Sequence, residues 1–273
     1  MTPTDRNSDP KEIVAVGGSV PSWLTEMSQE DTSTAGMSEH RILPRLKIIQ
    51  AMSDQGLKDE FGEGAVIISP GNGMVCDKKG YFDVTPLFYF NEFIQWSDRN
   101  DSGSGAILDR TFDPSSPLAA KCRDMERRME DYEGGQASNQ EHLNFVCLIQ
   151  SGPMEGQVVV LSFTKGEFQK GREFISGIHL RRMGTTQVPI YLHLWRFTPS
   201  FRERGSKKWF GLDYLNPDGP LYVGDNLENQ EVAEAMKQMH EELKKDYDAK
   251  RLGADYSEAD ASEKSDAGTT DEM

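Results

Sequence analysis

Several features are scarce in this chain of 273 residues, and each absence excludes a class of protein. Its three cysteines are odd in number and widely spaced, which argues against a disulfide framework and favours a reducing compartment. No run reaches about 18 consecutive apolar residues, so no membrane-spanning helix is expected. The first residues lack the basic and apolar regions of a signal peptide. These absences predict a soluble, intracellular protein that does not engage a membrane.

Apolar residues are also few. Hydrophobic residues make up 36% of the chain, which is low for a fully globular protein and predicts that both ends are unpacked. We therefore expect a disordered arm over residues 1–40, a folded domain over 41–225, a C-terminal helix over 226–252 and a disordered acidic tail over 253–273.

Enzyme motifs are missing as well. The sequence contains no G-x-x-x-x-G-K-[ST] phosphate loop, no G-x-S-x-G elbow and no H-E-x-x-H pair. Cys122, His142 and Cys147 could be the remains of a zinc site, but they lack the C-x-x-C pairing typical of one, and free structural cysteines are the preferred interpretation. We expect a non-enzymatic protein without cofactor or metal.

What is present is mostly a β pattern. Apolar runs between turn clusters predict strands within 64–96, 143–150, 158–163, 189–198 and 208–214. Residues 97–117 resemble a long loop, and 119–133 are charged and weakly helical. Thr164 is expected to cap a helix that reaches about Ile178. Short strands with one helix before the last hairpin predict a mainly β, α+β fold, specifically an OB-like Greek-key barrel.

The last predicted element is a helix from about Asn229 to Leu252. An apolar stripe with steps of four, three, four and four residues marks one face of this helix, and it consists of Val232, Met236, Met239, Leu243 and Tyr247.

Charge is sorted along the chain. The formal net charge is −15, yet the stretch from Val160 to Phe210 holds ten cations and three anions, a net +7, which leaves −22 for the rest. A basic centre followed by an acidic end is typical of a protein that binds and releases a polyanion.

A row of rings lies inside the basic stretch. With a period of two, Ile190, Leu192 and Leu194 point one way along the predicted strand, and the rings point the other way. The row consists of Tyr191, His193, Trp195 and Phe197. Such a row could stack on unpaired bases, and the alternative is that these rings belong to an ordinary core. His193 is interpreted as a structural or stacking ring.

The predicted loop that follows supplies cations. Trp209 returns on the face opposite to Phe210, Leu212 and Tyr214, and the expected phosphate and base contacts there are Phe201, Arg202, Arg204, Lys207 and Lys208. Arg181 and Arg182 could contact phosphate or only complement a helix dipole, and Lys165, Lys170 and Arg172 could equally be a solvated helix face.

The acidic end also has two interpretations. It is either a solubilising terminus or a tethered competitor that occupies the basic groove until a single strand displaces it. Its anions are Asp255, Glu258, Asp260, Glu263, Asp266, Asp271 and Glu272.

The order of motifs resembles that of phage-encoded single-stranded DNA-binding proteins of tailed-phage replication. The resemblance spans about residues 41–215, and its segments are 43–50, 93–96, 160–163, 170–174, 189–191 and 208–211. It implies an OB-type fold, binding of single strands without sequence choice, and an acidic tail that contacts replication partners. Two departures are the missing second cysteine near Cys122 and a tail that ends in Met273 rather than an aromatic residue.

The sequence therefore predicts a protein that coats single-stranded DNA in replication, recombination or repair, in the cytoplasm of an infected host. Expected partners are DNA and, through the tail, a polymerase or helicase; a homo-oligomer is possible. One alternative is a virion structural or assembly protein that uses the amphipathic helix for protein contacts. A nucleic-acid-processing enzyme is a further alternative.

Overall fold

The computed structural model describes residues 42–97, 106–132, 135–215, 227–249 and 253–254. The predicted N-terminal arm and the acidic tail from Asp255 onward lie outside these residues, and the predicted domain boundaries stay predictions.

The described fold is built on one mixed sheet of ten strands. Eight of them follow the order β13-β12-β5-β8-β9-β2-β3-β4, while β6 pairs with β5 and β7 pairs with β8. Neighbours are antiparallel except for the parallel pair β2–β9. The ten strands are β2 (Arg45–Ile48), β3 (Val66–Ser69), β4 (Gly73–Cys76), β5 (Phe82–Ser97), β6 (Ile107–Thr111), β7 (Met129–Tyr132), β8 (Gly135–Ile149), β9 (Val158–Phe163), β12 (Trp195–Arg204) and β13 (Lys207–Leu215).

The remaining described elements are short strands and helices. Two small sheets pair β1 (Ile42–Leu43) with β14 (Gly253–Ala254) and β10 (Arg182–Met183) with β11 (Thr186–Gln187). The helices are α2 (Gln55–Phe61), α3 (Pro117–Arg123), α4 (Phe168–His179) and α5 (Leu227–Asp248), with 3₁₀ turns at Lys165–Glu167 and Ile190–Leu192. The predicted α+β class, mainly β, is confirmed. The sheet does not close into a barrel among the described residues.

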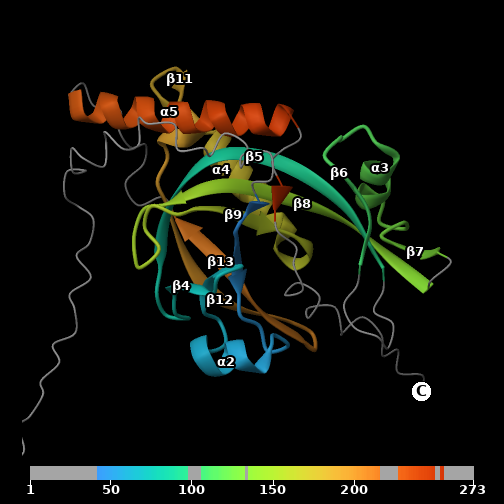
Figure 1. Ribbon diagram of the computed structural model, residues 1–273. Coiled ribbons are helices and arrows are strands. Elements are labelled where there is room, and N and C mark those ends of the chain that lie inside the picture. The colour runs from blue at the N-terminus through green and yellow to red at the C-terminus, as the bar shows by residue number, and fades with distance from the viewer. Residues whose placement is uncertain (1–41, 98–105, 133–134, 216–226, 250–252, 255–273) are drawn as a thin grey trace, which may run out of the picture. The chain divides into compact units, whose positions relative to one another are not determined.

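Two long strands form the centre of the fold. β5 and β8 pair from Val84↔Ile149 to Ser97↔Ala137, and they extend as an arch beyond the rest of the sheet (Figure 1). β6, α3 and β7 are attached to the far end of this arch. The sequence prediction placed a loop at 97–117, where β6 lies, and a weak helix at 119–133. α3 confirms the first part of that helix, and β7 corrects the last part. β6 and β7 are both edge strands with polar sequences. They are extended because they pair with the long strands β5 and β8, respectively.

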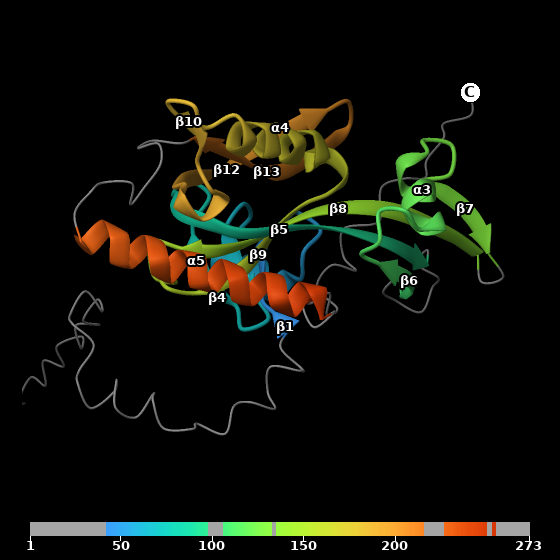
Figure 2. The ribbon, with the colours of Figure 1, turned by 90° about the horizontal axis from the view of Figure 1, so that it is seen from above.

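α4 packs on one face of the sheet, and α5 on the opposite face (Figure 2). Phe174 of α4 is fully buried, with ring centroids 4.9 Å from Phe145 and 5.3 Å from Phe197. Gly171 allows this approach, because a Cβ at that position would lie 2.6 Å from Cβ of Phe163. The predicted apolar face of the helix is confirmed, but the Thr164 side chain makes no capping hydrogen bond.

The predicted stripe of the C-terminal helix is also confirmed. Met236 and Leu243 of α5 are buried in a cluster with Phe90, Val146 and Val160 on the outer face of the sheet. Val232, Met239 and Tyr247 pack against the same cluster. The apolar face of α5 is therefore covered by the chain's own sheet.

His142 lies on the same side of β8 as Asn144 and opposite Glu92 of β5. Burial, reinforced by the charges of Arg45, Lys165 and Arg110, holds the pKa of His142 well below its usual range. The histidine is therefore neutral in the folded protein at neutral pH, whereas the unfolded chain binds a proton there below about pH 6.5. Its contribution to stability is present above that pH and is lost as the pH falls.

We therefore predict that acidification from about pH 7.5 to about pH 5.5 lowers the free energy of unfolding, with His142 contributing up to about 1.4 kcal/mol per pH unit. Urea denaturation at several pH values measures this dependence. The His142→Gln variant is expected to show a shallower dependence. Parallel curves for the variant and the native protein would show that His142 does not contribute.

Candidate nucleic-acid interface

The predicted row of exposed rings is wrong. Trp195 is 3% exposed and Phe197 is fully buried in the core beneath α4. The ring of Phe174 lies 4.9 Å from that of Trp195. His193 is also fully buried, with Nε2 3.2 Å from the carbonyl oxygen of Val188, and burial lowers its pKa. Tyr191 is half-buried, and its ring centroid lies 5.1 Å from that of His240 in α5. None of the four rings presents an open platform.

The physical reason is a change of backbone conformation within the segment. After Pro189, residues Ile190–Leu192 form a 3₁₀ turn, and the strand begins only at Trp195. The period of two therefore holds only from Trp195 onward. The alternation also does not specify which face is inside, and Phe174 fixes the Trp195 and Phe197 face as core.

The predicted basic loop over 199–208 is instead part of a long hairpin. β12 and β13 pair from Arg196↔Leu215 to Arg204↔Lys207, with the turn at Gly205 and Ser206. Gly205 has φ 63°, the left-handed conformation that a two-residue hairpin turn favours. The expected second strand is confirmed, and so is the core side of it, where Leu212 is 5% exposed.

The free end of this hairpin carries the exposed cations. Arg204 and Lys207 are cross-strand partners and are both exposed. Lys208, on the other face, is exposed and lies 3.8 Å from Glu203, a distance at which a surface ion pair contributes little. Phe201 is 53% exposed, with its ring 5.4 Å from that of Phe210. We call Phe201, Arg204, Lys207, Lys208 and Trp209 the hairpin surface.

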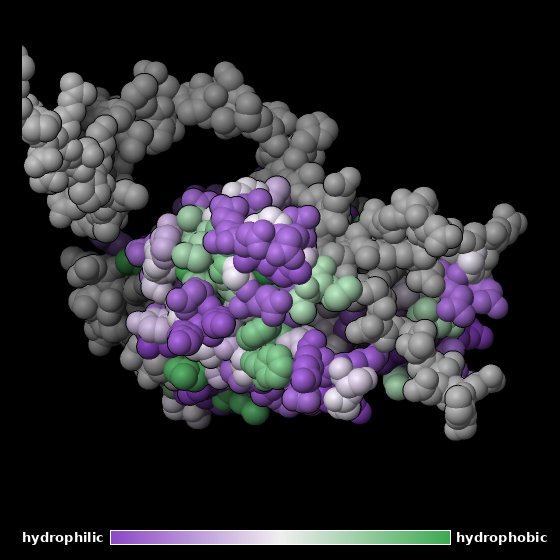
Figure 3. All heavy atoms as spheres, turned by 90° about the horizontal axis from the view of Figure 1, so that it is seen from below, coloured by the Kyte–Doolittle hydropathy of each residue, from purple (hydrophilic) through white to green (hydrophobic). Residues whose placement is uncertain are grey.

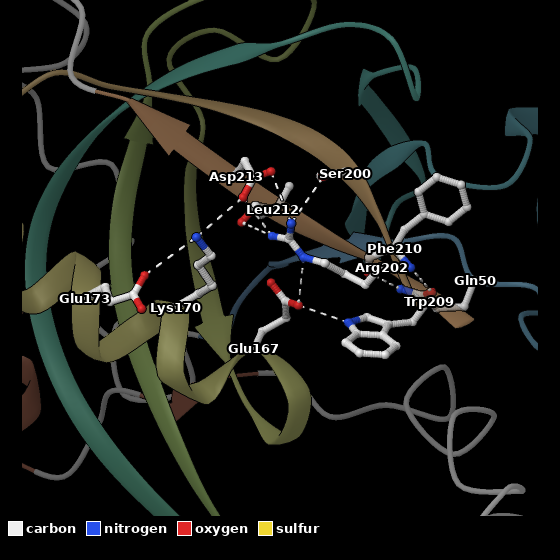
Figure 4. Close-up of polar contacts among 10 residues, drawn as sticks. All are labelled: Gln50, Glu167, Lys170, Glu173, Ser200, Arg202, Trp209, Phe210, Leu212 and Asp213. Carbon is white, nitrogen blue, oxygen red and sulfur yellow. Dashed lines mark hydrogen bonds and ion pairs between the residues drawn. The ribbon is translucent and has the colours of Figure 1, made fainter. Parts of the chain in front are cut away.

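Arg202, unlike the exposed cations of the hairpin surface, is bound by carboxylates of the chain itself. Its guanidinium donates two hydrogen bonds to the carboxylate of Asp213, at 3.1 and 2.8 Å, and a third at 3.4 Å to Glu167 (Figure 4). These contacts raise the pKa of Arg202 and lower that of Asp213. Lys170 lies 3.7 Å from Asp213 and 3.6 Å from Glu173. Arg202 and Lys170, which were predicted to contact phosphate, are therefore paired with carboxylates in this structure.

Trp209 is held at the base of the hairpin surface. Its Nε1 donates a hydrogen bond of 2.9 Å to Glu167 (Figure 4). The ring also packs against Gly166, where an added Cβ would lie 3.3 Å from it. Gly211 leaves room for the Glu167 carboxylate, because a Cβ there would lie 2.3 Å from it. The indole is half-buried and cross-strand to Arg202. The hydrogen bond to Glu167 and the contact with Gly166 therefore hold the indole in a fixed orientation.

The hairpin is also fastened to the segment between β2 and α2. Gln50 donates from Nε2 to the carbonyl oxygen of Phe210, and the Phe210 amide donates to Oε1 of Gln50, both at 2.8 Å. One side chain thus makes the pair of bonds that a neighbouring strand would make. Gln50, Glu167 and Gly211 were not predicted to matter for the site. The one signal in the sequence was Gly211, a glycine two residues after Trp209 on the same face of the strand.

The other predicted cations are not gathered at the hairpin surface. Lys165, Arg172 and Arg182 are exposed, and Arg181 is half-buried with its guanidinium 5.7 Å from the ring of Trp195. Arg181 and Arg182 follow the C-terminal end of α4, whereas Lys170 lies in its first turn. Figure 3 views the side where α2 and the hairpin lie in Figure 1, and hydrophilic side chains cover much of the described surface there. The predicted tail residues lie outside the described residues.

The two cysteines weighed as metal ligands lie in different clusters. Cys147 belongs to the core under α4, whereas Cys122 of α3 packs with Phe93 and Leu118. Burial raises the pKa of Cys122 to about 11 and that of Cys76 to about 12. Within the described ranges, no three His, Cys, Asp or Glu side chains are grouped as a metal would require.

Fold and site together define an α+β protein with an open mixed sheet, from which a braced basic hairpin extends. A family model described as Pam3 phage gp34-like protein matches residues 13–247. The chain belongs to this family. No curated protein and no solved structure matches it. No helix in the described part of the chain combines the length and apolarity needed to cross a membrane.

Proposed function

We propose that this chain is a non-enzymatic phage protein that coats single-stranded DNA during replication or recombination, largely without sequence choice. The hairpin surface carries the proposal. The exposed cations Arg204 and Lys207 lie on the same face of the hairpin as the half-buried indole of Trp209. Exposed Lys208 and the exposed ring of Phe201 lie on the other face of the same hairpin end. Cations that follow a backbone and rings that stack on bases are the two components of sequence-independent single-strand binding.

The strand connectivity supports an OB-type core within this proposal. β5, β8 and β9 form a meander, α4 follows, and the β12–β13 hairpin returns with β12 antiparallel to β5. In an OB fold the helix precedes the last two strands, and the loop between them contacts oligonucleotides. The turn at Gly205 is in the place of that loop. Gln50 spans part of the seam that a closed barrel would form between β13 and the rest of the sheet.

One face that OB folds use is covered here. The outer side of β8 and β9, with Val146 and Val160, packs against Met236 and Leu243 of α5. Burying two such side chains stabilises the folded state by about 1.5–3 kcal/mol each, so α5 is not readily displaced. We infer that the strand contacts the hairpin surface and not the sheet face beneath α5.

The proposal is tested first at Trp209. Replacing Trp209 by alanine removes the stacking ring and is expected to weaken binding of a 30-nucleotide oligo-dT by about 1–3 kcal/mol, with little change in the salt dependence. Fluorescence anisotropy of labelled oligo-dT measures both quantities. Tyr81→Ala is the matched control, because Tyr81 is 54% exposed and lies outside the hairpin. Equal affinities for the Trp209 variant and the native chain would remove the ring from the interface.

The acidic tail is proposed to compete with the strand and, once displaced, to recruit a polymerase or helicase in the host cytoplasm. Its seven carboxylates are opposite in sign to the hairpin cations. Deleting residues 255–273 is therefore predicted to tighten oligo-dT binding at low salt, and the gain shrinks as salt screens the tail. The same anisotropy titration measures the effect. An unchanged affinity at low salt leaves the tail with a solubilising role only.

The virion-assembly alternative required the apolar stripe of α5 for contacts with other proteins. That stripe is packed against the sheet, with Met236 at 8% exposure and Leu243 at 5%. The assembly alternative predicts no salt-dependent affinity for an oligonucleotide, and the enzyme alternative requires an activity that depends on a divalent ion. The titrations above separate the assembly alternative from the proposal, and incubation of labelled oligo-dT with and without Mg²⁺, followed by a test for cleavage, separates the enzyme alternative.

A further inference from the structure

We propose that a hollow at the C-terminal end of α4 binds one nucleotide, with the base inside the hollow and the phosphate at Arg182. The proposal extends the function proposed above and rests on it for the strand. It uses residues that the hairpin surface does not share. The nucleotide can be a unit of a single strand or a free mononucleotide, and both offer a planar base and a phosphate.

The hollow has a volume of about 390 Å³. This is within the range of small-molecule sites, about 300–1,000 Å³. Its walls include the apolar side chains of Ile175, Ile178 and Val188 and the ring of Tyr89. The hydroxyl of Tyr89 donates to Asn91, so the ring serves as an apolar wall. A flat, largely apolar guest fits such walls.

Polar groups stand at one rim. His179 and Gln187 both line the hollow, and Nε2 of Gln187 lies 3.2 Å from Nδ1 of His179. An amide offers both donors and an acceptor, the combination that pairs with the polar edge of a base. The imidazole orients the amide, because it contacts one of the two hydrogens on that nitrogen.

A cation lies next to this rim. Arg182 of β10 is the cross-strand partner of Gln187 of β11, and it is exposed. Its Nη1 donates to the carbonyl oxygen of Thr185 at 3.2 Å, which anchors the guanidinium at the short hairpin. Guanidinium groups bind phosphate through paired hydrogen bonds. The rim thus presents a base-reading amide and a phosphate-binding cation side by side, whereas an acyl chain or an apolar peptide would need neither.

The experiment uses the full chain and dTMP and dAMP as probes in ligand-detected NMR, with thymidine and inorganic phosphate as partial probes. Arg182→Ala and Gln187→Leu are each expected to weaken mononucleotide binding about tenfold, equivalent to about 1.4 kcal/mol. Val188→Phe fills the hollow and is expected to abolish the signal. Arg128→Ala is the matched control, because Arg128 is an exposed arginine outside every proposed contact. Circular dichroism verifies that each variant is folded.

Competition with oligo-dT distinguishes the two sources. If the oligonucleotide displaces the mononucleotide, the hollow holds a unit of the strand; if both bind together, the hollow holds a free nucleotide. Either result supports the site. It is overturned if no mononucleotide binds at millimolar concentration, or if the Arg182 and Gln187 variants bind like the control. Failure of the hairpin proposal is a separate result, in which hairpin variants leave oligo-dT affinity unchanged while mononucleotide binding persists.

Discussion

Replacing Trp195 by alanine is expected to lower the free energy of unfolding by about 3–5 kcal/mol, the usual cost of truncating a buried aromatic residue. Trp195 is 3% exposed, and its ring lies 4.9 Å from Phe174 and 5.6 Å from Tyr214. The cavity left by the indole would remove its contacts with Phe174 of α4 and with Tyr214 of β13. Urea denaturation of the variant and the native chain measures the loss.

The control for this variant is Trp209→Phe, which changes a half-buried indole and is expected to cost much less stability. The comparison separates a core tryptophan from one in the interface. A Trp195→Ala protein of native stability that had lost only its affinity for oligo-dT would contradict the core assignment. It would restore the row of rings as a binding platform.

The second large effect is expected at the end of the hairpin. Replacing Arg204, Lys207 and Lys208 together by alanine removes three exposed cations, and each phosphate contact on a single strand contributes about 0.7 to the slope of log K against log salt. The triple variant should therefore flatten that slope by about two units and bind oligo-dT much more weakly at low salt. Lys207→Ala alone should flatten it by about 0.7.

Binding of labelled oligo-dT at four or more salt concentrations measures the slope. Lys78→Ala with Lys79→Ala is the control, because these lysines are exposed in the turn between β4 and β5. The stability of the triple variant should match that of the native chain, since none of its three side chains is buried. An unchanged slope would show that the strand binds elsewhere.

Much of the fold follows from local patterns in the sequence. The stripe from Val232 to Tyr247 predicted the face of α5, and Phe174 and Ile178 predicted the face of α4. Each helix packs one side on one face of the sheet, so its apolar residues recur with the helical period and the buried side can be read from the local sequence. The alternation at Leu212 predicted the core side of β13 for the same reason.

The site depended on contacts that no local pattern records. Arg202 seemed available for phosphate, but Glu167, 35 residues away in the chain, and Asp213 engage it. Trp195 seemed exposed, because alternation does not show which side of a strand another helix covers. β6 and β7 were missed since an edge strand depends on its partner more than on its own composition. Arg204 and Lys207 are exposed cross-strand partners, and their predicted contact with phosphate stays a prediction.

The most direct test of the account is the fluorescence of Trp209 during titration with single- and double-stranded 30-nucleotide DNA at two salt concentrations. Trp195 and Trp96 are buried at 3% and 7% exposure. The fourth tryptophan, Trp23, lies outside the described residues and is replaced by phenylalanine in both proteins, so the difference between Trp23→Phe and Trp23→Phe with Trp209→Phe isolates the hairpin ring. We predict quenching by single strands that exceeds that by duplex, weakens with salt, and is lost in Trp209→Phe. Quenching that persists unchanged in Trp209→Phe, or no binding of single strands at low salt, would contradict the hairpin as the interface.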